Sequence, residues 1–170
     1  ENKNLNELIS HVNIELQKIN NWFKTNKMEL NVSKTKYIIF RTKGKQIPDD
    51  IPQIVINQND PKEPNAYDPS KIFTVDRVHN NANNLSDKVY KLLGINFDEY
   101  LSFDKHIETL CSKLTRANFC MRRASNKLST KALKSLYYAM FHSHLIYCIN
   151  IVSCTSKSNL KRIKILQKKA

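Results

Sequence analysis

The 170-residue chain predicts an α+β fold, in which a long helix and a small antiparallel sheet precede an all-α bundle of three helices. Three observations support this. Apolar residues recur at helical spacing near the start, short β-branched runs follow between residues 35 and 97, and helical spacing returns from residue 102 to the end. Strands followed by a run of helices are typical of α+β proteins.

The first helix is predicted over residues 4–25. Its apolar residues repeat every three or four positions and would form one buried face, made by Leu5, Leu8, Val12, Leu16, Ile19 and Phe23 and widened by Ile9 and Trp22. Asn4 followed by Glu7 resembles a capping box, and Asn26 is a typical stop. A short strand over residues 35–41 should follow, because aromatic and β-branched residues fill that run.

Residues 44–88 are predicted to form a variable surface loop. All five prolines lie there, and only 54–56 and 72–75 have strand character. The run 89–97 is predicted to be a strand pair or a bent strand. It is broken at Gly94, where a glycine within a strand indicates a bulge or a close backbone approach.

Three helices are predicted beyond residue 101. The first has an apolar seam at spacings of three and four residues, made by Ile107, Leu110, Leu114, Ala117, Met121, Ala124 and Leu128. The second helix begins after Ser129, and the third begins at Ser156 or Ser158. Short connections would make the three helices antiparallel neighbours.

Positive charge is concentrated in the helical part. Residues 101–170 contain 14 Lys and Arg against two acids, whereas residues 1–100 contain 14 against 13 acids. The cations form stripes on the first and third of these helices, at Lys105, Lys113, Arg116, Arg123, Lys127, Lys157, Lys161, Lys164 and Lys168. Solvated helix faces usually mix both signs, so this imbalance favours a polyanionic partner, with phosphate backbones ahead of an acidic membrane surface.

Several kinds of site are not expected. Gly44 and Gly94 are the only glycines, so no Gly-rich phosphate loop can be written. Prolines bracket Asp49 and Asp50 in a polar loop, which indicates a solvated turn rather than a metal-binding pair. The histidines and cysteines near the end of the chain are not spaced as zinc ligands are. We therefore expect no metal at His142, His144, Cys148 and Cys154, and we expect the cysteines to be structural thiols.

The chain has no signal peptide or membrane-spanning run, and an intracellular location in the cytoplasm, the nucleus or both is expected. It lacks an initiating Met and stops within a basic helical pattern, so it is expected to be a piece of a larger protein.

Two patterns, in this order, resemble the reverse transcriptase of non-LTR retrotransposons of the LINE-like, jockey-like group. Residues 22–35 read W-F-x-x-N-K-x-x-L-N-x-x-K-T, and residues 93–107 read L-G-I-x-x-D-E-x-L-S-F-x-x-H-I. The helical stretches LKSLYYAMFHSHLIYC and LKRIKILQKKA follow them. The resemblance covers the chain apart from 44–88. It implies that residues 1–100 are the C-terminal part of the palm and that residues 101–170 are a basic helical thumb.

The resemblance also implies roles for single residues. Lys34 matches a lysine near the phosphates of the incoming nucleotide, where it would protonate the pyrophosphate leaving group. The primer grip, a hairpin that holds the primer's 3′ end, would be formed by Leu92, Leu93, Gly94 and Ile95. The stripe cations of the thumb would contact the sugar-phosphate backbone of an RNA/DNA template–primer duplex.

The aromatic-x-Asp-Asp box of that family, which holds the catalytic metals, is absent from the chain. The chain alone should therefore be inactive and bind no cofactor and no small-molecule substrate. Mg²⁺ is expected only in the intact polymerase, whose fingers and catalytic palm would be partners. Two other functions remain open, a non-catalytic nucleic-acid-binding module and a helical interaction domain for an acidic partner.

Overall fold

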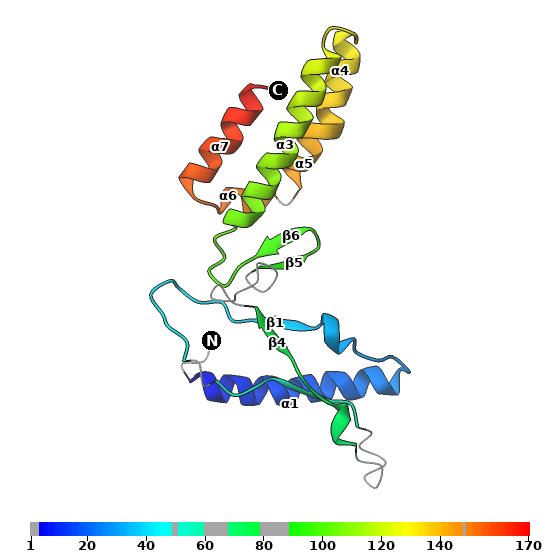
Figure 1. Cartoon of the computed structure of the whole chain (residues 1–170), viewed down its shortest axis with the longest axis vertical. Coiled ribbons are helices and arrows are strands. Elements are labelled where there is room, and N and C mark those ends of the chain that lie inside the picture. The colour runs from blue at the N-terminus through cyan, green and yellow to red at the C-terminus, as the bar shows by residue number, and fades with distance from the viewer. Residues whose placement is uncertain (1–3, 49–50, 60–67, 79–88, 148) are drawn as a thin grey trace. The chain divides into compact units, whose positions relative to one another are not determined.

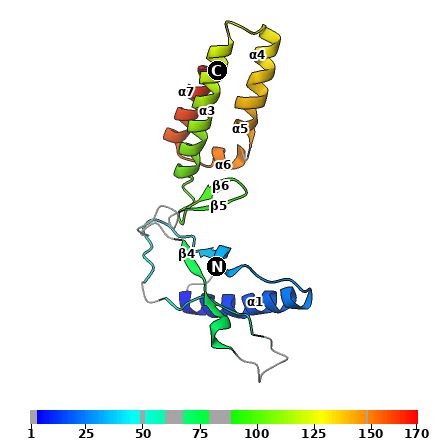
Figure 2. The ribbon, with the colours of Figure 1, turned by 45° about the vertical axis from the view of Figure 1, so that its right-hand side comes forward.

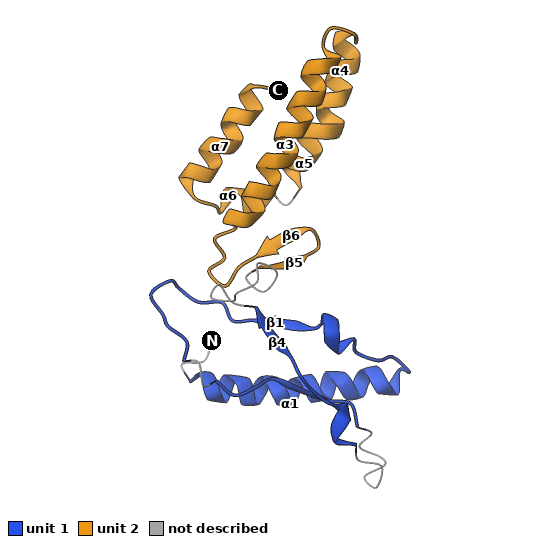
Figure 3. Ribbon diagram, in the orientation of Figure 1, with its two compact units in different colours: residues 1–82 blue, residues 83–170 orange. Residues whose placement is uncertain are grey.

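The computed structural model describes residues 4–48, 51–59, 68–78, 89–147 and 149–170. The chain divides into two compact units, unit 1 (Glu1–Ala82) and unit 2 (Asn83–Ala170), each with its own apolar core (Figure 3). The predicted α+β class is confirmed, since helices and short strands occur in the expected order (Figure 1). The units divide before the hairpin of residues 89–97, and the boundary between palm and thumb at 100/101 stays a prediction.

Unit 1 combines one long helix with two separate strand pairs. Helix α1 spans Leu5–Thr25, and its first turn is capped by the side chain of Asn4, which accepts a hydrogen bond from the Asn6 N–H at 3.1 Å. The strands are short and bring distant segments together in two pairs, β1 (Lys36–Ile38) with β4 (Asp76–Val78) and β2 (Val55–Asn57) with β3 (Ile72–Thr74). The β1–β4 pair is parallel, so the expectation of an all-antiparallel sheet holds only for β2–β3 and for the hairpin of unit 2.

The buried face of α1 differs from the predicted one. Ile9 is 2% exposed and Asn20 is equally buried, whereas several members of the predicted face are at least 36% exposed, namely Leu8, Val12, Ile19 and Trp22. The helix is turned so that the line through Ile9 and Leu16 contacts the core residues of β2. The other apolar line therefore remains open to solvent in unit 1.

A row of polar side chains explains why α1 packs in this orientation. Amide groups on one flank of the helix hydrogen-bond the backbone beside β2, at Asn13, Gln17 and Asn20, and the Lys24 ammonium donates to the Asn59 carbonyl at 2.6 Å. The Asn13 amide both donates and accepts, since its Oδ1 also accepts a hydrogen bond from the Val55 N–H at 3.0 Å. These bonds satisfy an edge strand that would otherwise present open backbone groups.

Unit 2 joins a β-hairpin to a helical bundle. The hairpin consists of β5 (Tyr90–Leu92) and β6 (Ile95–Phe97), and helix α3 (Asp104–Ala124) follows it. Figures 1 and 2 show α3 lying between α7 (Lys157–Lys168) and the pair α4 (Thr130–Tyr137) and α5 (Ser143–Ile146), in agreement with its contacts to each. The predicted seam of α3 is buried from Ile107 to Met121, but Leu128 lies beyond the helix and is 43% exposed.

The second predicted helix is continuous in direction but changes type. Helix α4 (Thr130–Tyr137), capped by Ser129, passes into the π-helical turn η4 (Tyr138–His142) and then into α5 (Ser143–Ile146). A short helix α6 (Ile149–Ser153) then reverses the chain before α7, which Ser156 caps. Among the described residues, no helix has both the length and the apolarity that crossing a bilayer requires.

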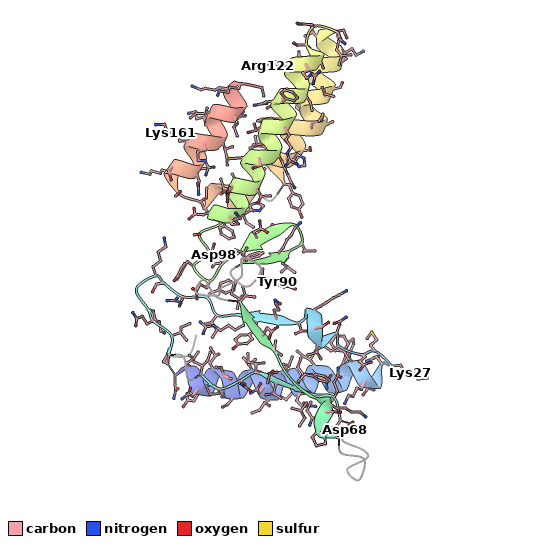
Figure 4. The ribbon with its side chains drawn as sticks, in the orientation of Figure 1. Lys27, Asp68, Tyr90, Asp98, Arg122 and Lys161 are labelled. Atoms are coloured by element: carbon pink, nitrogen blue, oxygen red, sulfur yellow. The ribbon has the colours of Figure 1, made fainter. Side chains whose placement is uncertain are left out.

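The loop between β6 and α3 is organised by one buried carboxylate, Asp98 (Figure 4). Its two oxygens accept four hydrogen bonds of 2.8–3.2 Å, from the backbone N–H groups of Tyr100, Ser102 and Phe103 and from the Ser102 hydroxyl. Leu101 and Phe103 have positive φ, a conformation that costs free energy in residues with a side chain. The carboxylate therefore stabilises a strained loop that sets where α3 begins.

Asp98→Ala should lower the free energy of unfolding of unit 2 by on the order of 3 kcal/mol, because three backbone donors lose their acceptor in a strained loop. Glu108→Ala is the matched control, since it also removes one carboxylate from unit 2 but from an exposed side chain. Urea unfolding of the full chain followed by circular dichroism measures the difference. Equal midpoints for the two variants would contradict this role of Asp98.

Candidate functional site

The hairpin of unit 2 ends in a two-residue turn formed by Leu93 and Gly94. Leu92 pairs with Ile95 across the turn, and both turn residues have positive φ, 48° and 84°. Positive φ at both positions is typical of the type I′ turns that match the twist of a hairpin. Leu93 is 80% exposed and Leu92 is 50% exposed, whereas Ile95 is buried, so the hairpin presents apolar side chains at its tip.

Tyr147, just after α5, supports this turn from the helical side. Its hydroxyl donates a hydrogen bond to the Leu93 carbonyl, and its ring lies against Gly94, where a Cβ added to the glycine would meet ring atoms at 3.6 Å. That separation is an ordinary contact, so the positive φ is what requires glycine here. The sequence offered no signal for Tyr147, because it lies 54 positions from the hairpin.

The hairpin also contacts α3 where the cationic stripe passes. The Asn96 amide donates to the Thr109 hydroxyl at 3.4 Å, and Gly94 and Lys113 line one small cavity. Lys113 is a member of the predicted stripe. The structure therefore brings one predicted backbone-binding cation next to the predicted primer-grip turn.

The α3 stripe lies on the solvent side of that helix. Lys113, Arg116, Arg123 and Lys127 are exposed, and at 100° per residue Lys105, Arg116 and Arg123 fall close to one line along the helix. Lys105 is half-buried and forms an ion pair with Glu108 at 2.7 Å, and this hydrogen bond holds the pKa of the Glu108 carboxyl below its usual value. The Arg123 guanidinium lies over the Phe119 ring at 5.5 Å.

The α7 stripe is exposed as well, and α7 is held by polar contacts on its other side. The Asn159 amide donates to Asp104 Oδ1 at 2.6 Å, and the Asn118 amide donates to the Leu166 carbonyl at 2.8 Å. Lys161 lies on the side of α7 that faces away from α3 (Figure 4). The other three lysines of this stripe are also exposed, at Lys157, Lys164 and Lys168.

One further group of cations was not predicted from the sequence. A groove of about 550 Å³ lies between α3, α4 and the end of α7, and its lining includes Arg122, Lys134 and Lys169 beside Tyr137 and Tyr138. The helical periodicity of each helix was visible, but the meeting of three helices at one groove was not. Aromatic and cationic side chains together are common on surfaces that bind nucleic acids.

Lys34 lies in unit 1, at the end of a 3₁₀ turn (Val32–Lys34) just before β1. The Asn31 side chain caps this turn by accepting the Lys34 N–H at 3.2 Å, and the Lys34 side chain is exposed. The parallel register of β1 places Lys36 opposite Asp76. Burial raises the pKa of the half-buried Tyr37 next to it.

No group of three or more His, Cys, Asp or Glu side chains in the described ranges is arranged to hold a metal ion. Asp49, Asp50 and Cys148 lie outside those ranges. Cys111, Cys120 and Cys154 are free thiols, and burial raises the pKa of Cys111.

Gly94→Ala should destabilise the hairpin turn by about 1 kcal/mol, because alanine at a φ of +84° meets the left-handed penalty. Gly44→Ala is the control, since nothing lies within 4 Å of its added Cβ and its φ is not positive. Amide hydrogen exchange of the hairpin measures the change, and about fivefold faster exchange is expected in Gly94→Ala alone. Identical exchange in both variants would contradict this interpretation of the turn.

The chain was compared with known proteins. No family model and no solved structure matches it. It is 31% identical over 84 residues to the RNA-directed DNA polymerase from the mobile element jockey of Drosophila funebris, and 31% identical over 86 residues to that of Drosophila melanogaster. These matches span 47% and 48% of the chain but 9% of each relative. About half of the chain is thus similar to a small part of these RNA-directed DNA polymerases.

Proposed function

We propose that this chain is the C-terminal palm and thumb portion of a non-LTR retrotransposon reverse transcriptase, and that it binds and positions the template–primer duplex. The observation that carries the proposal is the uncompensated positive charge of unit 2. The stripe cations of α3 and α7 are exposed or half-buried, and the α3 stripe reaches the Gly94 turn through Lys113. The similarity to two jockey polymerases supports the same interpretation.

Contacts of this kind suit a backbone rather than a base sequence. Lysine and arginine side chains on the outer side of a helix reach phosphate oxygens and fix the register of a duplex, but they do not read base edges. Double-stranded A-like helices are recognised largely through shape and phosphate contacts. The proposed role is therefore to hold the duplex while another part of the polymerase performs the chemistry.

Chemistry requires partners that this chain does not supply. The metal-binding aspartate box is absent from the sequence, so the fingers and the catalytic palm of the intact polymerase would provide the Mg²⁺ site. The exposed apolar line of α1 is a suitable contact for such a neighbour, since Leu8, Ile19 and Trp22 together form a long unpaired face. In that assembly Lys34 would lie near the nucleotide phosphates as a general acid.

A helical domain that binds an acidic protein is the second candidate. The same cations would favour it, but the apolar hairpin tip beside Lys113 has no evident use in such a contact. A non-catalytic nucleic-acid-binding module would use the same surface. It would differ from a polymerase in lacking an aspartate box in the sequence upstream of residue 1. Salt dependence separates the protein partner from the two nucleic-acid alternatives.

Binding of the chain to a short RNA–DNA duplex should weaken steeply with salt, with log affinity falling by about 0.9 per log unit of salt for each phosphate contacted, as calibrated on B-DNA. Removing three cations in Lys113→Gln/Arg116→Gln/Arg123→Gln should reduce that slope by about 2 to 3. Fluorescence anisotropy at four or more salt concentrations measures both slopes.

The matched control removes the same charge from exposed positions of unit 1, in Lys43→Gln/Lys45→Gln/Lys71→Gln. This variant should keep most of the slope, because its cations lie outside the two stripes. A flat slope for the unmodified chain, or equal loss in both triple variants, would overturn the proposed duplex surface.

Lys34→Ala, made in the intact polymerase, should slow nucleotide incorporation by about 100-fold or more if the ammonium protonates pyrophosphate. Affinity for the template–primer should not change, since Lys34 lies outside the stripes. Single-turnover incorporation beside duplex binding measures both, with Lys43→Ala as an exposed-lysine control. Unchanged turnover would remove Lys34 from the mechanism.

A further inference from the structure

A small cavity lies where the hairpin meets the helices of unit 2. Its volume is about 110 Å³, and it is lined by Gly94 of the turn, His106, Thr109, Leu110 and Lys113 of α3, His144 of α5, and Tyr147. At about 30 Å³ for each water molecule, this space suits a group of three or four oxygen atoms. None of the lining residues is a carboxylate.

His106 is the unusual member of this lining. The side chain is on the first turn of α3, the residue is only 7% exposed, and its Nδ1 has no hydrogen-bond partner among the described residues. A native fold rarely leaves a buried ring nitrogen unpaired unless a ligand or a water completes it. Burial, with a smaller contribution from the Lys113 ammonium, lowers the pKa of His106, so the ring is neutral near pH 7.

Two further lining side chains, those of Lys113 and His144, have donors that no other described residue uses. Thr109 and Tyr147 already use their hydroxyls, which donate to the Lys105 and Leu93 carbonyls. The side chains of Lys113 and His144, by contrast, make no hydrogen bond or ion pair with other described residues. The hairpin contributes only Gly94, whose missing side chain leaves that wall to backbone atoms. The cavity therefore combines one ammonium and two imidazoles with no opposing negative charge.

We infer that this cavity binds a single phosphate group, held by His106, Lys113 and His144 beside the Gly94 turn. The inference rests on the proposed function for its natural source, a phosphodiester of the bound duplex. A free phosphate offers the same chemistry, and the experiment distinguishes the two. The lysine supplies charge, and each imidazole donates one N–H to a phosphate oxygen.

The site predicts a pH dependence with a definite sign. A bound phosphate stabilises the protonated form of an imidazole beside it, so binding should raise the pKa of His106. The affinity for a phosphodiester, whose charge is constant in this range, should therefore rise as the pH falls from 8 to 6. The Lys113 ammonium opposes protonation of the His106 ring, and the other titratable side chains that line the cavity are His144 and Tyr147.

The test uses the full chain labelled with ¹⁵N, titrated with inorganic phosphate at pH 6 and pH 8 against sodium chloride of equal ionic strength. Imidazole signals of His106 and His144 should shift saturably. The sign of the pH dependence is tested with the duplex, because inorganic phosphate itself gains a proton between pH 8 and pH 6. His106→Gln and Lys113→Gln should abolish the shifts of the remaining imidazoles. His142→Gln, in the same unit but outside the cavity, should leave them unchanged. Because Lys113 is exposed, Lys113→Gln should fold normally. The test therefore stays valid even if His106→Gln fails to fold.

A second arm uses the RNA–DNA duplex at the same two pH values and at fixed salt. Several-fold tighter binding at pH 6, lost in Lys113→Gln and His144→Gln, would identify the duplex as the source of the phosphate. Saturable phosphate shifts without pH-dependent duplex binding would identify free phosphate instead. Either result supports the site.

Imidazole signals that respond to neither probe would overturn the inference, as would shifts that survive both His106→Gln and Lys113→Gln, since these would show an adventitious ion only. Such failures leave the proposed duplex surface intact if the steep salt dependence persists. A flat salt slope beside saturable phosphate binding would instead reject the proposed function and retain the phosphate site.

Discussion

Two carboxylates govern the electrostatics of the helical segment. Asp104 and Glu108 are the only acids in residues 101–170, against 14 lysines and arginines. Both are already engaged within the fold, since Asp104 accepts the Asn159 amide and Glu108 pairs with Lys105. The first contact anchors α7 to the start of α3, and the second lies along α3 itself. The acids therefore stabilise the bundle and leave almost all of its positive charge uncompensated.

That arrangement is costly without a partner. The Cβ atoms of residues three or four positions apart on a helix are about 5–6 Å from each other, which is less than the Debye length of about 10 Å at 0.1 M salt. Successive stripe cations on α7 therefore repel one another with little screening. A polyanion laid along the stripe converts this repulsion into attraction and releases its own counterions. The hairpin held by Tyr147 gives the surface a fixed edge, which a freely moving loop would not provide.

Sequence reasoning succeeded where local pattern decides structure. The α3 seam, the Ser129 and Ser156 caps and the break at Gly94 all follow from spacing or from one residue type. It failed where tertiary contacts override the pattern. Helix α1 has two apolar lines, and polar bonds from buried Asn20 and its neighbours to β2 select the line through Ile9. Tyr147 and the unpaired His106 became visible only once the hairpin lay against α3 and α5.

The geometry of the two stripes bears on which kind of polyanion fits. On α3, Asp104 and Asn118 contact α7, and at 100° per residue they lie far around the helix from Arg116 and Arg123. Lys161 lies away from α3 in turn, and at 100° per residue the other stripe lysines of α7 share its side of the helix. A single acidic helix or extended acidic segment could follow one of these lines but would leave the other unneutralised. A duplex carries a charge about every 1.7 Å of its axis, distributed over both strands, and can meet more than one line of cations as it passes. Electrostatics and helix geometry together therefore favour a nucleic-acid duplex over an acidic protein segment.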